Sequence, residues 1–277
     1  MTKPPVNAAT LVDIGANLTH ASFRDDLPQV LHRAAAHGVA QIVVTGTSVH
    51  ASRAALALAQ ANPAMLRCTA GVHPHDAQHC NAETIPALRS LAAFPEVVAL
   101  GECGLDFNRN YSPRRDQEKW FVAQLELACE LGKPLFVHSR DAHPRLAEIL
   151  GESRGRLSRV VVHCFTGEAE ELRAYLELDC HIGITGWICD ERRGRHLHSL
   201  VRDIPSDRLL LETDSPYLTP RDLRPQPHAR RNEPAFLPHI AATVARALGK
   251  TLEQLAGETS ANARQFFAPA ANQPRIA

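Results

Sequence analysis

The chain has 277 residues, of which 30 are basic and 30 acidic, so its formal net charge is zero. With 44% hydrophobic and 22% charged residues, its composition is that of an ordinary globular protein that can bury a full core. The N-terminal segment has no apolar stretch of the signal-peptide type, and no apolar run approaches the roughly 20 residues of a membrane-spanning helix. These features exclude the secreted and membrane classes.

The cysteines also bear on the class of protein. There are seven, an odd number, and none has C-x-x-C spacing, which disfavours both a disulfide framework and a zinc knuckle. Free thiols are typical of a reducing compartment, so we expect a cytoplasmic protein. The zero net charge removes the argument for nucleic-acid binding from a globally basic surface, but it leaves room for a local basic patch.

Short runs rich in β-branched residues recur along the chain at a pitch that fits one strand, one helix and two loops. The runs begin at Leu11, Val39, Leu66, Val97, Pro134, Arg159, His181 and Leu209. Eight alternating strand and helix units predict a parallel sheet covered by helices, as in a (β/α)8 TIM barrel. A doubly wound open sheet is the alternative, but no G-x-G-x-x-G follows the first run to support it.

Helical patterns lie between these runs. Apolar residues from Leu27 to Ala35 recur at helical spacing, and Gly38 is a natural stop. A second pattern includes Phe121 to Ala128, with Ser112-Pro113 expected to provide its cap and first turn and Gly132 its end. Both patterns predict helices that cover the sheet.

The last part of the chain begins with a proline-rich stretch, residues 215–234, whose length predicts a functional loop. Helical patterns over 235–248, 251–256 and 259–267 are expected to close one face of the barrel. The first eight residues and residues 268–277 are predicted to be disordered. The sequence thus predicts one TIM-barrel domain over 1–277, with its core at about 11–267.

Polar residues stand where the predicted strands end. In a closed barrel these carboxyl ends converge on one mouth, where barrel enzymes place their chemistry. A single residue there would be an ordinary polar strand end, but several in register are hard to satisfy without an ion or a substrate. Mixed nitrogen and carboxylate donors suit Mg²⁺, Mn²⁺ or Zn²⁺. The candidate residues are His73, His75, Glu102, His138, His163 and Asp214.

Cysteine and serine are disfavoured as the chemical groups. Cys103 and Cys164 each directly follow a candidate ligand, so the alternation of side chains predicts that both point away from the mouth and pack against helices. Ser139 and its neighbour His138 are likewise expected to face opposite ways, and no G-x-S-x-G is present. A serine-nucleophile mechanism is therefore disfavoured.

Several segments in combination resemble the TatD family of metal-dependent deoxyribonucleases. They are GVHPHD, GECGLDF, HSRDAH, VHCFTG, GITGW and ETDSPYL, and the resemblance runs from about residue 11 to 267. It implies a TIM barrel of the amidohydrolase-like type that hydrolyses phosphodiester bonds with a divalent cation. It further implies a 3′-to-5′ exonuclease on single-stranded DNA that also accepts RNA, with a role in DNA repair or nucleic-acid turnover.

Carried over by position, the resemblance implies that Glu102, His138, His163 and Asp214 hold the metal, and that Glu102 and Asp214 are also catalytic. Mg²⁺ is the expected ion, with Mn²⁺ and Zn²⁺ as alternatives. Two further catalytic residues, His73 and His75, match a segment near the substrate phosphate. Either would donate a hydrogen bond to the phosphate or protonate the leaving group.

The first strand departs from the family pattern. Most relatives end it with H-x-H, which supplies two metal ligands, whereas this chain has Gly15 and Asn17. Glycine cannot ligate and asparagine offers one neutral oxygen, so we expect weak metal binding.

Arginines and aromatic residues near the mouth favour a polyanionic strand. Trp187 or Tyr217 would stack on a base. Arginines that would bind phosphates are Arg140, after the fifth strand, and Arg221, Arg230 and Arg231, in the loop after Asp214. We expect single-stranded DNA or RNA as the substrate, no membrane partner and a monomer.

Two other functions remain open. A similar metal centre would activate water against another substrate, such as the ester of a mischarged aminoacyl-tRNA or a small cyclic amide. A non-catalytic nucleic-acid-binding protein would keep the fold while its site decayed. The arginine-rich loop favours a polyanion over a small neutral substrate, and the retained ligand set argues against decay.

Overall fold

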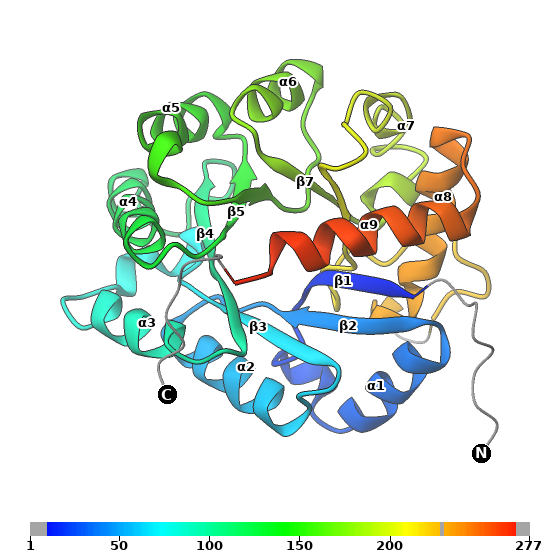
Figure 1. Ribbon diagram of the computed structural model, residues 1–277, viewed down its shortest axis with the longest axis horizontal. Helices are drawn as coiled ribbons and strands as arrows, with labels where there is room; N and C mark the ends of the chain where they lie inside the picture. Colours follow the sequence, from blue (N-terminus) through cyan, green and yellow to red (C-terminus); the bar gives the residue numbers. More distant parts are fainter. Residues whose placement is uncertain (1–9, 228–229, 270–277) are drawn as a thin grey trace.

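The protein is described here from a computed structural model, which covers residues 10–227 and 230–269. Eight parallel strands follow one another around the sheet in sequence order, with helices on the outside (Figure 1). This arrangement confirms the predicted TIM barrel. The terminal segments predicted to be disordered lie outside the described residues, apart from 268 and 269.

The elements follow the predicted alternation closely. The strands are β1 (Leu11–Ala16), β2 (Val39–Val44), β3 (Leu66–Ala70), β4 (Val97–Asp106), β5 (Leu135–Arg140), β6 (Val160–Val162), β7 (His181–Ile184) and β8 (Leu209–Leu211). The helices are α1 (Leu27–Ala36), α2 (Val49–Ala61), α3 (Thr84–Ala92), α4 (Arg114–Leu131), α5 (His143–Ser153), α6 (Ala169–Glu177), α7 (Leu197–Leu200), α8 (Leu237–Leu248) and α9 (Leu252–Phe266). No helix among the described residues is long and apolar enough to cross a membrane.

The barrel closes where β1 meets the segment that follows β8. Ala16 pairs in parallel with Ser215, and the backbone N–H of Asp214 donates to the carbonyl of Gly15 at 2.8 Å. The N–H of Asn17 donates to the carbonyl of Ser215 at 2.7 Å. Residues about 200 positions apart in the sequence therefore lie side by side at the mouth of the barrel.

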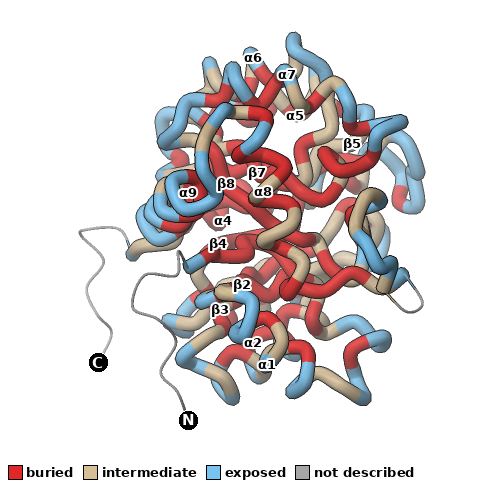
Figure 2. The backbone as a smooth tube through the Cα atoms, turned by 90° about the vertical axis from the view of Figure 1, so that its right-hand side faces the viewer, coloured by how far each residue is buried: buried red, intermediate tan, exposed pale blue. Residues whose placement is uncertain are grey.

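Two apolar layers hold the barrel together, because successive side chains of a strand point to opposite faces. One layer lies between the strands and the surrounding helices and includes Cys103. The other fills the barrel interior, and Figure 2 shows the strands as the buried centre of the molecule. The interior layer contains Val12, Ile14, Ala99, Phe136, Val161 and Leu210, together with Ala263 and Phe266 of α9.

Helix α9 closes the amino end of the barrel, as predicted for this part of the chain (Figure 1). The Ser260 hydroxyl donates to the carbonyl of Thr10, just before β1, and the Asn262 amide donates to the carbonyl of Leu209, where β8 begins. The two predicted helices, 251–256 and 259–267, form one continuous helix. Thr251 caps it with a capping box, and its buried face runs unbroken past Gly257.

The start of α4 differs from the prediction. Pro113, rather than Ser112, is the N-cap residue, and no side chain caps the helix there. The Ser112 hydroxyl instead donates to the carbonyl of His75 at 2.7 Å and accepts from the backbone N–H of Gln78 at 3.0 Å. Ser112 therefore anchors the loop that carries His75.

Candidate active site

The mouth of the barrel contains a cavity of about 870 Å³ at the carboxyl ends of the strands. The structure brings most of the predicted site residues together in its wall. Those residues are His73, His75, Glu102, His138, Arg140, His163 and Asp214, and Trp187 and Tyr217 line it as well. Arg221, Arg230 and Arg231 are not among the residues that line the cavity.

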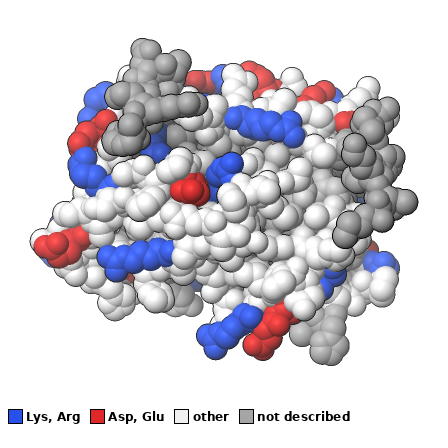
Figure 3. Space-filling view, turned by 60° about the horizontal axis from the view of Figure 1, so that its bottom comes forward, with Lys and Arg blue, Asp and Glu red and all other residues white. Residues whose placement is uncertain are grey.

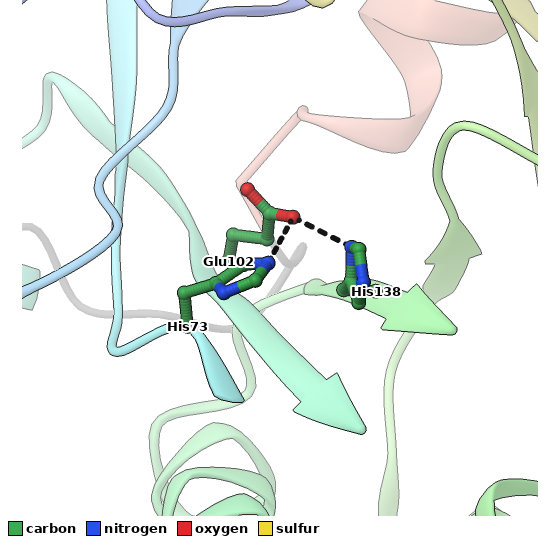
Figure 4. Close-up of side chains that lie close together, drawn as sticks. All are labelled: His73, Glu102 and His138. Carbon is green, nitrogen blue, oxygen red and sulfur yellow. Dashed lines mark ion pairs between the residues drawn. The ribbon is translucent and has the colours of Figure 1, made fainter. Parts of the chain in front are cut away.

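Glu102, near the end of β4, is the meeting point of three imidazole rings. Its Oε1 lies 3.3 Å from Nε2 of His73 and 3.0 Å from Nδ1 of His138 (Figure 4). The same oxygen lies 2.7 Å from Nε2 of His163, and Glu102 is only 5% exposed. The charge of this carboxylate is therefore balanced by nitrogen donors or by a cation that they share.

The electrostatics of this cluster favour an ionised glutamate. Burial alone would raise the pKa of Glu102, but the positive charge of His163 and hydrogen bonds from His138 and His163 hold it well below its usual range. Burial alone would lower the pKa of His163, but the negative charges of Glu102 and Glu212 raise it well above its usual value. The cluster thus holds a buried negative charge that requires a positive partner.

The two histidines after β3 have different environments. Nδ1 of His73 accepts the backbone N–H of His75 at 3.1 Å, so the proton of the neutral ring lies on Nε2. Burial lowers the pKa of His73 to about 4, which keeps the ring neutral near pH 7. In this state the Nε2–H of His73 faces Glu102 as a hydrogen-bond donor, and the donor atoms of His73, Glu102 and His138 lie within 4.8 Å of one another, a group that could hold a metal ion.

Asp106, at the end of β4, orients His75. Its Oδ2 lies 2.6 Å from Nε2 of His75 and 3.6 Å from Nε2 of His138. Its Oδ1 accepts the backbone N–H groups of Asn108 and Arg109. Burial would raise the pKa of Asp106, but the nearby His138 ring and the hydrogen bond with His75 lower it below its usual range. The carboxylate therefore stays ionised beside both rings.

Asp214 lies on the other side of the cavity, next to β1. Its Oδ1 accepts a hydrogen bond from the Asn17 side-chain amide at 2.9 Å. Burial raises the pKa of Asp214 to about 8; the charge of His163 opposes this shift, and those of Glu102 and Glu212 add to it. Asn17, which the sequence suggested only as a lost ligand, orients this carboxyl group.

The donor set fits a divalent cation. His163 faces a carboxylate with each nitrogen, Glu102 at 2.7 Å and Glu212 at 3.3 Å, and its raised pKa means that the ring carries a proton on both nitrogens when no cation is bound. Nε2 of His138 is buried without a hydrogen-bond partner. A cation bound beside Glu102 would take the place of the extra ring proton as the positive partner, with Nε2 of His163 and Nδ1 of His138 as nitrogen donors and Asp214 as a further oxygen donor.

The arginines are placed differently from one another. Arg140 and Arg193 line the cavity, and their guanidinium carbons lie 5.7 Å and 4.3 Å from the ring centre of Trp187. Arg231 instead forms two hydrogen bonds with the carboxylate of Asp26, at 2.8 and 2.6 Å. Nε of Arg221 lies 3.7 Å from the carboxylate of Asp190. Arg109, which follows β4, also lines the cavity, so the positive charge of its wall comes from the β4, β5 and β7 ends.

Among the described residues on the surface seen from the lower side of Figure 1, Lys and Arg do not gather as they do on the cavity wall. On the part of this face that Figure 3 colours, Lys and Arg side chains lie singly or beside Asp and Glu, without a broad patch of one sign. A strand of nucleic acid would find little continuous positive charge on this face.

The prediction for the two cysteines is half right. Cys103 is buried between the strands and the helices, as expected. Cys164 lines the cavity, and its thiol lies 3.8 Å from the hydroxyl of Thr185. The alternation of a strand does not apply there, because β6 ends at Val162 and Cys164 has a φ of 48°.

A second group of donor atoms lies away from the cavity lining, at Cys189, Asp222 and His239. Each of its potential ligands already has a protein partner. The Cys189 thiol donates to the hydroxyl of Thr243, and Nε2 of His239 lies 2.7 Å from the carboxylate of Asp222. These partners account for the group without an ion.

Three further residues that contact the candidate site were not among the residues predicted from the sequence. Asp106 stands in the GECGLD segment, Glu212 directly precedes the Thr-Asp pair, and Arg193 follows Trp187 by six residues. The first two are acidic residues close in sequence to the predicted ligands Glu102 and Asp214, and this proximity could have identified them. The sequence position of Arg193 does not indicate a place at the site. Its guanidinium group reaches the cavity only because the segment after β7 folds back onto Trp187.

Comparisons with known proteins find relatives over nearly the whole chain. The family described as TatD related DNase matches residues 12–268. Proteins named 3′-5′ ssDNA/RNA exonuclease TatD are similar at 51% identity in Pectobacterium parmentieri and 52% in Edwardsiella piscicida. Each match spans 257 residues, 93% of this chain and 99% of the relative.

Solved structures are similar over the whole barrel. A TatD family hydrolase from Entamoeba histolytica has a TM-score of 0.86 at 25% identity, covering 94% of this chain and 99% of that one. A TatD homologue from Escherichia coli has a TM-score of 0.84 at 27% identity, covering 94% and 98%. The predicted family and its hydrolytic nuclease class are confirmed: the chain belongs to the TatD-related DNase family.

Proposed function

We propose that this chain is a divalent-metal-dependent exonuclease that removes nucleotides from the 3′ end of single-stranded DNA and RNA. The observation that carries the proposal is the cluster around Glu102, where three imidazole nitrogens meet one buried carboxylate oxygen on a cavity wall that also carries arginines. The 3′-to-5′ direction and the two substrates rest on the names of relatives about 51% identical to the chain.

Four residues would hold the cation: Glu102, His138, His163 and Asp214. Mg²⁺ is the ion we propose, with Mn²⁺ and Zn²⁺ as alternatives that the same donors accept. When bound, a divalent cation neutralises charge on the phosphate and lowers the pKa of a coordinated water molecule.

The remaining roles belong to side chains of the chain itself. In its ionised form Asp214 accepts a proton from the attacking water, and the hydrogen bond from Asn17 fixes its orientation. His73, which is neutral at pH 7, turns its single Nε2–H from Glu102 to a non-bridging phosphate oxygen when the substrate is bound. His75, oriented by Asp106, is then the candidate proton donor to the leaving oxygen.

The substrate strand would lie against the wall formed by the ends of β5 and β7. Arg140 and Arg193 bind phosphates there, and Trp187 stacks on a base. Tyr217 offers a second ring on the opposite side, where it packs edge-on against His20 with ring centres 5.8 Å apart. Arg221, Arg230 and Arg231 lie outside this wall, so we give them no part in strand binding.

End-labelled oligonucleotides test this function directly. With Mg²⁺, a 5′-labelled single strand should shorten in steps, whereas a 3′-labelled strand should release its label at once; a chelator should stop both reactions. A closed circular single strand is the control and should survive. Cleavage of the circle would contradict the exonuclease assignment, and full activity in chelator would contradict the metal-dependent one.

A further inference from the structure

Glu212 directly follows β8 and is fully buried beneath the cavity, where it contacts the β6 end. Both of its carboxylate oxygens accept hydrogen bonds. Oε1 accepts the backbone N–H of Cys164 at 2.5 Å, and Oε2 accepts from Nδ1 of His163 at 3.3 Å. A buried carboxylate is costly, so a fold that keeps one here gains something specific from it.

The barrel leaves room for this carboxylate by placing glycine on both sides. A Cβ atom at Gly15 would lie 2.5 Å from Oε2 of Glu212 and 3.1 Å from the Phe136 ring. A Cβ atom at Gly183 would lie 2.5 Å from Oε1. No side chain larger than hydrogen fits at either position while Glu212 holds its place.

The contact with His163 decides which nitrogen of that ring is available. A neutral imidazole, the form that can bind a cation, keeps its lone pair on Nε2 when it donates Nδ1–H to a carboxylate. Nε2 of His163 is the atom that lies 2.7 Å from Glu102, at the centre of the cluster. Glu212 thus fixes both the rotation of the ring and the nitrogen that faces the proposed cation.

We propose that Glu212 is a positioning residue, which acts through His163 to build the metal centre, and that Gly15 is retained to admit its carboxylate. This proposal rests on the proposed function, because it concerns the same site. It also gives a reason for the departure of β1 from H-x-H. Position 15 makes room for Glu212, and position 17 supplies the amide that holds Asp214.

The two acceptor roles of Glu212 make glutamine an informative replacement. Glutamine has one oxygen, so it can accept from Cys164 or from His163 but not from both. If the oxygen faces Cys164, the amide N–H₂ faces Nδ1 of His163 and drives the ring proton onto Nε2. If it faces His163, the N–H of Cys164 loses its partner. Either arrangement disturbs the site with almost no change in volume.

The first experiment measures Mn²⁺ affinity by calorimetry without nucleic acid. We expect Glu212→Gln to weaken Mn²⁺ binding by about 10–100-fold, the usual effect of losing a carboxylate behind a histidine ligand. Glu233→Gln is the matched control, because Glu233 is also a buried carboxylate but pairs with Arg33 at 2.6 Å, away from the cavity lining. It should bind Mn²⁺ as the wild type does.

Enzyme assays then separate positioning from general damage. In Glu212→Gln the Mn²⁺ concentration for half-maximal activity should rise by the same factor as the dissociation constant. At saturating Mn²⁺, the KM for the oligonucleotide should stay near the wild-type value and part of kcat should return. A variant that is merely less stable would lose kcat without shifting the metal dependence.

A double-mutant cycle tests the role of Gly15 and still applies if Glu212→Gln folds poorly. Gly15→Ala alone should lower both the melting temperature and the affinity for Mn²⁺, because it displaces the carboxylate. In a Glu212→Ala background, the same Gly15→Ala change should lower the melting temperature by less than half as much. Additive effects would mean that the two residues do not compete for space.

The outcomes separate this proposal from the function on which it rests. Unchanged Mn²⁺ affinity in a folded Glu212→Gln protein would overturn the positioning role while leaving the nuclease assignment intact. A wild-type protein that binds Mn²⁺ and loses that binding in Glu212→Gln, yet never degrades single strands, would overturn the nuclease assignment and support the positioning role.

Discussion

The carboxylate of Glu102 contacts His73, His138 and His163, so its removal should affect the chemistry more than any other single change in the cavity. We expect Glu102→Ala to lower the turnover of single-stranded DNA by at least about 100-fold, because several kcal/mol of transition-state stabilisation depend on the bound cation. Turnover is measured with a labelled oligonucleotide, and circular dichroism checks the fold. Wild-type turnover in a folded Glu102→Ala protein would remove this residue from the mechanism.

The arginines differ in what their replacement should do. In the inactive Glu102→Ala background, Arg140→Ala and Arg193→Ala should each reduce the log–log salt slope of single-strand binding by roughly 0.7, the share of one phosphate contact. Arg231→Ala should leave the slope unchanged and lower the melting temperature, because Arg231 ties the loop to Asp26. A reduced slope in Arg231→Ala would show that it contacts the strand after all.

Asp13 in β1 makes stability depend on pH. Burial raises its pKa from 3.8 to about 7, against hydrogen bonds from Thr213 and Gly15 and with a contribution from the charge of Glu212. A folded-state pKa above the unfolded one means that the native state binds the extra proton, so this stability is complete below about pH 4 and is lost as the pH rises through 7.

Asp13→Asn stays neutral at every pH, so its stability should vary less between pH 5 and pH 8 than that of the wild type. The amide oxygen still accepts the N–H groups of Gly15 and Thr213, and the Thr213 hydroxyl can turn to accept from the amide. Urea midpoints in chelator give the comparison. Identical pH profiles for the two proteins would show that Asp13 does not titrate in this range.

At the scale of elements, α9 seals the amino end of the barrel through Phe266, which is fully buried among interior residues. Phe266→Ala should lower the free energy of unfolding by about 3–5 kcal/mol, since it leaves a cavity in the barrel interior. Phe94→Ala, at a side chain that is 43% exposed, is the control and should cost little. Chemical denaturation measures both, and equal losses would mean that α9 packs loosely.

The elements themselves were largely predictable from the sequence. Most strands are short runs rich in β-branched residues, and the unit length repeats, so the starts of all eight strands were found within one residue. The continuity of α9 was not, because Gly257 interrupts the apolar pattern although the capping box at Thr251 and the buried face hold the helix. The cap of α4 was misassigned because Ser112 bonds to a neighbouring loop rather than to its own helix.

Closure of the barrel, where β1 pairs with the segment after β8, explains which parts of the site could be predicted from the sequence. Glu102, His138, His163 and Asp214 could be found because strand ends converge in any barrel. Gly15 and Asn17 looked like lost ligands, since nothing local shows that they face Glu212 and Asp214. That information exists only once the barrel closes and residues 15–17 lie beside 212–215.

The same closure changes the prediction for a restored H-x-H. The sequence alone suggests that histidines at positions 15 and 17 would raise the affinity for Zn²⁺. In the structure, Gly15→His would place a Cβ atom 2.5 Å from Oε2 of Glu212, and Asn17→His would remove the amide that orients Asp214. We now expect the double variant to melt at a lower temperature and to bind Zn²⁺ no more tightly, as calorimetry would show.

Metal binding should stabilise the whole barrel, because the proposed ligands come from β4, β5 and the ends of β6 and β8, and a cation joins them only in the folded state. At a concentration about 100 times the dissociation constant, the gain is about 2.7 kcal/mol, or roughly 5–10 °C in melting temperature for a chain of this size. With no histidine at the end of β1, binding should be weak enough for dialysis to remove the ion. The melting temperature of the dialysed protein should therefore rise with added Mg²⁺ or Mn²⁺. Glu102→Ala should abolish this rise, and Glu233→Gln should retain it. A wild-type melting temperature that does not change in millimolar Mn²⁺ would mean that these residues do not form a metal centre.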